Sequence, residues 1–73
     1  SEMCIRDRSK NAYILEFKVH NPRTEDSLKD TVSKALLQID EKNYDAELIA
    51  DGFREEQICH FGFAFEGKHV LIG

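Results

Sequence analysis

One stretch near the start of the chain, residues 12–19, decides the fold, and it reads AYILEFKV. It is rich in β-branched and aromatic residues and is followed closely by Pro22, which predicts a β-strand. Side chains alternate between the two faces of a strand. We therefore expect Glu16 and Lys18 to share the face that opens on a cleft. The other face is wholly apolar and is expected to be buried; it carries Tyr13, Leu15, Phe17 and Val19.

A helix is expected after this strand. Thr24 or Asp26 can cap its start, and Glu25 suits the positive end of its dipole. Gln38 lies on the flank of the apolar stripe of this helix, whereas Leu37 points away from the stripe and is expected to be exposed. The stripe consists of apolar residues at spacings of three and four, namely Leu28, Val32, Ala35, Leu36 and Ile39.

A second, shorter helix is predicted from residue 43 or 44 to residue 51, with Gly52 directly after its end. Two strands follow, at about residues 58–65 and 69–72, joined by a tight turn. The order strand, helix, helix, strand, strand predicts an α/β fold with a mixed sheet, in which a right-handed crossover joins the first two strands. The second helix is expected to bury two apolar residues, Leu48 and Ile49.

Composition narrows the class of protein. The chain has 73 residues, enough for one domain, with 41% hydrophobic and 33% charged residues, which is typical of a globular protein. The net charge of -4 provides no basic field and argues against a free-standing DNA binder. No apolar run approaches the roughly 20 residues that span a bilayer. We expect a reduced, cytoplasmic protein without a membrane partner, in which Cys4 and Cys59 stay unpaired.

The first eight residues differ in character from the rest. Residues 3–8 read MCIRDR, which resembles the translation of a transposon-end adapter used in sequencing libraries. No periodic apolar pattern precedes Ala12. We therefore expect residues 1–8 to be artefactual and to take no part in the folded core, so that the domain comprises residues 9–73.

The strand carries a Glu-x-Lys pair. Glu16 can hold a hard divalent cation through oxygen, as Mg²⁺ prefers. Lys18 can sit over a phosphate, or orient and deprotonate an attacking water. On spacing alone, an ion pair between the two on a half-exposed strand is the commoner explanation. His20, two positions further on, could touch a phosphate but is expected to be solvated.

The wider sequence adds a family resemblance. Residues 13–19 are followed by ALLQI at residues 35–39 and by Tyr44, and then by residues 44–52 and 61–72. Together these segments resemble the small PD-(D/E)XK nuclease domain at the C-terminal end of AAA-type ATPase-like proteins of anaerobic bacteria. The resemblance implies a partial restriction-endonuclease-like fold and covers nearly the whole chain from residue 10 onward.

The resemblance also implies roles for individual residues. Glu16 would be the second acidic metal ligand, and the carbonyl oxygen of Phe17 would complete the shell around Mg²⁺. Lys18 would be the catalytic lysine. Gln38 and Tyr44 would orient this lysine or contact phosphate, although their spacing of six residues is wider than the commoner pattern. The first acidic residue of the motif has no counterpart, so the chain is expected to bind Mg²⁺ weakly and to be inactive alone.

Three functions remain open from the sequence. The first is a Mg²⁺-dependent phosphodiesterase that acts on DNA or RNA. The second is a non-catalytic interaction or regulatory module, attached to an AAA-type ATPase domain in the same parent chain. The third is an unrelated small α/β domain that pairs with another chain through the apolar surface around Leu37. An acidic residue on a strand encoded upstream of Ser9 would favour the first.

Overall fold

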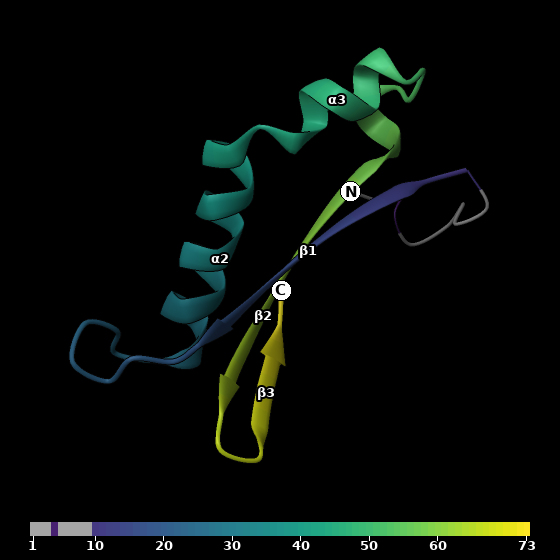
Figure 1. Cartoon of the computed structure of the whole chain (residues 1–73). Coiled ribbons are helices and arrows are strands. Elements are labelled where there is room, and N and C mark those ends of the chain that lie inside the picture. The colour runs from purple at the N-terminus through teal and green to yellow at the C-terminus, as the bar shows by residue number, and fades with distance from the viewer. Residues whose placement is uncertain (1–3, 5–9) are drawn as a thin grey trace.

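The computed structural model describes residue 4 and residues 10–73. Within these residues the order of the strands and α-helices is the predicted one, and a short 3-10 helix that was not predicted precedes the second strand (Figure 1). The elements are β1 (Ala12–Val19), α2 (Leu28–Lys42), α3 (Tyr44–Ala50), the short 3-10 helix η1 (Glu55–Gln57), β2 (Ile58–Glu66) and β3 (His69–Ile72). Strand β2 lies in the middle of the sheet, parallel to β1 and antiparallel to β3. The predicted mixed α/β fold is therefore confirmed.

Helix α2 packs against one side of the sheet (Figure 1). Its predicted apolar stripe is confirmed, since Val32, Ala35 and Ile39 are buried. The helix backbone comes close to the sheet at Gly62, where an added Cβ would lie 2.9 Å from the carbonyl oxygen of Val32. A residue without a side chain is therefore needed at this position of β2. None of the helices in the described part of the chain has the length and apolar character to cross a membrane.

The face of β1 that the helix covers is not the one expected. Glu16 and Lys18 are half-buried on the helix side of the strand, whereas exposure of the apolar face runs from 43% at Tyr13 to 73% at Val19. The prediction that this apolar face is buried was wrong. Alternation along a strand shows which side chains share a face, but it does not show against which face a helix packs.

Small residues on β2 explain which face the helix covers. Gly62 pairs with Glu16 and Ala64 pairs with Lys18, and both small residues are buried. These positions leave room for α2. The opposite face of the sheet is crowded by aromatic rings; the ring of Phe17, for example, lies 4.9 Å from that of Phe63, centroid to centroid. This apolar surface, which we call the aromatic face, comprises the exposed Tyr13, Leu15, Phe17, Val19, Val70 and Ile72 and the half-buried Phe61, Phe63 and Phe65.

The helix ends differ in part from the predictions. The N-cap of α2 is Ser27, rather than Thr24 or Asp26. Gly52 has a φ of 104° just after α3, as expected for the residue that follows a helix end. Ile49 is 50% exposed, so the prediction that it is buried was wrong. Helix α3 is too short to present a continuous apolar stripe to the sheet.

The two cysteines form a disulfide, so the prediction that they stay unpaired was wrong. Cys4 is also buried, which contradicts at this one residue the prediction that residues 1–8 take no part in the core. The remaining residues of that segment lie outside the described part of the chain. Two cysteines 55 positions apart give no sign of pairing in the sequence, because only the fold brings their Cα atoms to 5.8 Å.

Candidate functional site

Glu16 and Lys18 project from the same face of β1, as predicted, yet they do not pair with each other. The Nζ atom of Lys18 lies 3.6 Å from a carboxylate oxygen of Glu25. Both carboxylate oxygens of Glu16 lie 3.4 Å from Nζ of Lys42. No ion pair joins Glu16 to Lys18 among residues 10–73. The structure therefore differs from the commoner explanation of the Glu-x-Lys spacing, a direct ion pair.

Lys42 links two of the predicted site residues. Its ammonium contacts the carboxylate of Glu16 and also lies 5.9 Å from the centroid of the Tyr44 ring. Lys42 was not among the residues predicted for the site. Helix α2 has 15 residues and spans about 22 Å, close to the roughly 26 Å of the eight-residue strand β1. A helix that returns along the strand thus brings its last turn beside β1, but the lengths of the elements do not single out Glu16, the fifth of the eight strand residues, as the partner of Lys42.

Gln38 lies on α2, one turn before Lys42, and is half-buried. Within the described residues its side chain makes no hydrogen bond to Glu16 or Lys18. Its position on the flank of the buried stripe agrees with the expected geometry of the helix. The role of Gln38 toward phosphate or toward Lys18 remains a prediction.

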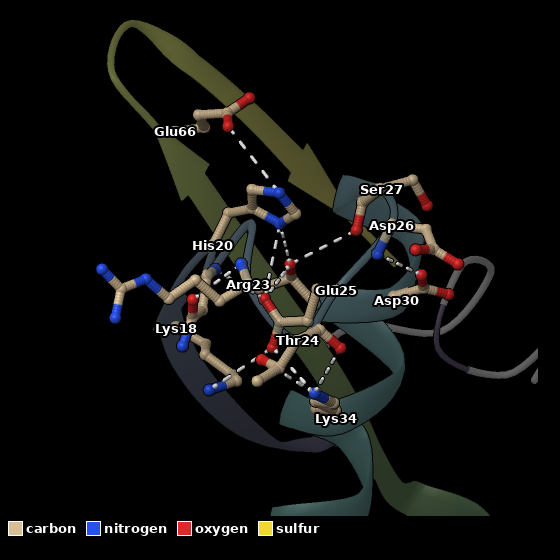
Figure 2. Close-up of polar contacts among 12 residues, drawn as sticks. Lys18, His20, Arg23, Thr24, Glu25, Asp26, Ser27, Asp30, Lys34 and Glu66 are labelled. Carbon is tan, nitrogen blue, oxygen red and sulfur yellow. Dashed lines mark hydrogen bonds and ion pairs between the residues drawn. The ribbon is translucent and has the colours of Figure 1, made fainter.

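Lys18 belongs to a polar cluster around Glu25, in the loop between β1 and α2 (Figure 2). Glu25 is only 3% exposed. Its Oε1 accepts a hydrogen bond from the backbone N–H of Asn21 at 2.7 Å and another from the hydroxyl of Thr31 at 2.8 Å. Its Oε2 faces two ammonium groups, that of Lys34 at 3.3 Å and that of Lys18 at 3.6 Å.

These contacts keep Glu25 ionised. The backbone hydrogen bond from Asn21 is the largest cause that lowers the pKa of Glu25 from 4.5 to about 2. Burial opposes this change, whereas the hydrogen bond from Thr31 and the ammonium of Lys34 reinforce it. Sequence reasoning assigned Glu25 only to the dipole of the helix, because its partners come from separate segments that the loop brings together.

The lowered pKa of Glu25 predicts acid sensitivity. Because the pKa is about 2 in the folded chain and 4.5 otherwise, the unfolded chain takes up the proton first as the pH falls. The contribution of Glu25 to the free energy of unfolding should be complete above about pH 5 and be lost between about pH 4.5 and pH 2. Urea unfolding at a series of pH values measures this. Glu25→Gln should flatten that part of the profile, and an unchanged profile would contradict the assignment.

Asp30→Asn is the matched control for this series. Asp30 also accepts a hydrogen bond from a backbone N–H four residues earlier, that of Asp26, at 2.9 Å. It has no ammonium group within ion-pair distance among the described residues. The acid-dependent loss of stability should therefore be retained in Asp30→Asn.

His20 is buried by the same loop, so the prediction that it is solvated was wrong. Its side chain is 6% exposed, and Nδ1 lies 2.7 Å from the hydroxyl oxygen of Thr31. Nε2 lies 3.7 Å from a carboxylate oxygen of Glu66 (Figure 2). The ring thus lies among groups from the loop, from α2 and from β2, which the local sequence does not bring together.

A second histidine joins three elements at the other end of the sheet. Nε2 of His60 on β2 lies 2.6 Å from the carboxylate of Asp45 in the first turn of α3. Nδ1 lies 3.7 Å from Asp40 on α2. This interaction was not predicted from the sequence. It holds the start of α3 beside β2, and so helps to place Tyr44, the first residue of α3.

The side chains described do not form a complete metal site. Glu16 is a ligand of the kind that Mg²⁺ prefers, but Mg²⁺ binds in near-octahedral geometry and takes several oxygen ligands. Within residue 4 and residues 10–73, no group of three or more His, Cys, Asp or Glu side chains could hold a metal ion. At Glu16 the positive charge is provided by Lys42 instead. The donor set thus fits one ligand of a magnesium site and does not fit the whole of it.

Comparison with known proteins identifies the family. The chain matches the family model of the PD-(D/E)XK nuclease superfamily over residues 2–73, a range that includes the adapter-like residues 3–8. Searches of curated proteins and of solved structures gave no significant match. The mixed three-stranded sheet with its two helices, in the described part of the chain, is consistent with a partial restriction-endonuclease-like fold. The chain belongs to the PD-(D/E)XK nuclease superfamily.

Proposed function

We propose that this chain provides the Glu-x-Lys part of a Mg²⁺-dependent phosphodiesterase that cleaves nucleic acid. The observation that carries the proposal is the separation of the two charges. Glu16 and Lys18 lie on one face of β1, and each is held by a different partner, so that neither neutralises the other. Membership of a nuclease superfamily supports the same reaction class.

In this proposal each predicted site residue has a role. Glu16 and the carbonyl oxygen of Phe17 contribute ligands to Mg²⁺, which when bound would stabilise charge on the phosphate. Lys18 contacts the scissile phosphate or orients the attacking water. Gln38 and Tyr44 orient Lys18 or contact phosphate. A further carboxylate has to come from outside residues 10–73, so we expect weak Mg²⁺ binding and no cleavage by the chain alone.

The parent protein supplies the remaining parts. We propose that it is a bacterial, cytoplasmic protein in which this domain accompanies an AAA-type ATPase domain. The substrate is DNA or RNA. Because the chain has a net charge of -4, most of the attraction for the phosphate backbone has to come from other parts of the parent.

Two observations favour an alternative, a non-catalytic interaction or regulatory module attached to the ATPase. Lys42 already pairs with Glu16, which is what a site that has lost its metal would show. The aromatic face is also large and exposed, as is common at protein–protein contacts. In that case the pair between Glu16 and Lys42 would be a permanent structural contact.

A cleavage assay separates these functions. DNA and RNA, single- and double-stranded, are incubated with this chain and with a longer protein that includes the natural sequence encoded upstream of Ser9, with Mg²⁺ or with EDTA. We expect cleavage only by the longer protein, only with Mg²⁺, and not by its Glu16→Gln variant. A longer protein that folds and binds Mg²⁺ but cuts nothing would favour the interaction module.

A further inference from the structure

We infer that Glu25 is a positioning residue for Lys18: it draws the ammonium of Lys18 toward the loop between β1 and α2 and away from Glu16. The inference rests on the proposed function, in which Lys18 acts on the phosphate while Glu16 binds the metal. It assigns to Glu25 a part in the site that neither the Glu-x-Lys spacing nor its place before a helix suggests.

The two oxygens of Glu25 differ in their contacts. Oε1 is used by the loop, because it accepts hydrogen bonds from Asn21 and Thr31. Oε2 accepts no hydrogen bond within the described residues, although it is buried. The ammonium groups of Lys18 and Lys34 compensate the charge of Oε2. A buried carboxylate oxygen is costly without a partner, so Oε2 attracts both lysines.

The carboxylate of Glu25 is held in a fixed position. Glu25 is hydrogen-bonded to the backbone of its own loop and to Thr31 of α2, so the carboxylate has a defined place at the end of β1. Lys18, by comparison, carries its ammonium on a long, rotatable side chain that is 27% exposed. A fixed carboxylate beside a flexible lysine determines where the ammonium lies. Figure 2 shows Lys18 and Lys34 both directed at Glu25, while the guanidinium of Arg23 points away.

This arrangement affects the site because of the i, i+2 spacing. Without Glu25, Glu16 would be the nearest carboxylate on the same strand face, and Lys18 could pair with it. Such a pair would cover the carboxylate that the proposed function needs for metal and would hold the ammonium that it needs for phosphate. Glu25 keeps the two groups apart.

The test is nuclear magnetic resonance of the lysine side chains in this chain, with Glu25→Gln as the main variant. Glutamine has the same shape, and its carbonyl oxygen can still accept from Asn21 and Thr31, so the loop is kept while the charge is removed. In the unsubstituted chain we expect nuclear Overhauser contacts between Lys18 and Glu25. We also expect an ammonium order parameter for Lys18 above that of the exposed Lys68.

In Glu25→Gln the contact between Lys18 and residue 25 should disappear and the order parameter should fall to that of Lys68, with new contacts from Lys18 to Glu16. Asp30→Asn, which changes a carboxylate in the first turn of α2, should leave Lys18 unchanged. Backbone amide spectra establish that each variant is folded. The inference is overturned if Lys18 keeps its contacts with residue 25 and its order parameter in a folded Glu25→Gln variant. It is also overturned if Lys18 contacts Glu16 in the unsubstituted chain.

Lys34→Met keeps the inference testable if Glu25→Gln does not fold. Lys34 is 42% exposed, and its removal leaves Lys18 as the ammonium that faces Oε2. The order parameter of Lys18 should then rise, and a fall would count against the inference. Cleavage is not the readout of these experiments. A longer protein that fails to cut would therefore refute the proposed function alone, and a Lys18 that ignores Glu25 would refute the positioning role alone.

Discussion

Under the proposed function, replacing Lys18 with alanine in the longer protein should reduce Mg²⁺-dependent cleavage by a factor of roughly 100 to 10,000, the usual contribution of a group that moves or orients a proton at a reacting centre. Lys18 is half-buried on the face of β1 that carries Glu16, and its ammonium is held by Glu25 rather than by Glu16. Initial rates of cleavage with saturating Mg²⁺ measure the effect.

Lys68→Ala is the control for this prediction. Lys68 lies in the exposed turn between β2 and β3, on a different part of the sheet. The Lys68→Ala substitution removes the same charge from the protein as Lys18→Ala, so its effect on cleavage reports any general attraction for nucleic acid. If Lys18→Ala and Lys68→Ala reduce cleavage equally, Lys18 has no specific role in the reaction.

The second large effect concerns the core. Ile39→Ala should lower the free energy of unfolding by about 2–5 kcal/mol, because Ile39 is fully buried between α2 and the sheet and its truncation leaves a cavity. The total free energy of unfolding of a 73-residue domain is only about 4–11 kcal/mol. This single change can therefore unfold a large part of the population at room temperature.

Leu37→Ala is the matched control on the same helix. Leu37 is 55% exposed, so its truncation should change the free energy of unfolding by less than about 0.5 kcal/mol. Urea unfolding followed by circular dichroism measures both variants. Equal losses of stability in the two would mean that α2 packs on the sheet by a different stripe.

The elements could be predicted from the sequence because their signals are local. The β-branched and aromatic residues of β1 and the spacing of three and four in α2 each lie within a single segment. The turn before β3 is marked by Gly67, which has a φ of 57°. The alternation of side chains along β1 likewise places Glu16 and Lys18 on one face, whatever the rest of the chain does.

The remaining features depend on contacts between distant segments. The helix covers the face of Glu16 because Gly62 and Ala64, more than 40 residues later, leave room there. The partners of the two site residues, Glu25 for Lys18 and Lys42 for Glu16, are likewise set by the loop and by the last turn of α2. None of these pairings has a signature in spacing. The disulfide could not be predicted for the same reason.

The central claim is that Glu16 binds a divalent ion beside Lys18. The most direct measurement is titration of Mn²⁺, which accepts the oxygen ligands that suit Mg²⁺, into the ¹⁵N-labelled chain while paramagnetic broadening of each amide is followed. We predict that Glu16, Phe17 and the paired Gly62 broaden first, at millimolar Mn²⁺. The broadening should disappear in Glu16→Gln, persist in Asp30→Asn and increase in Lys42→Met, which removes the competing ammonium. Broadening that is absent at these amides, or that is unchanged in Glu16→Gln, would contradict the claim.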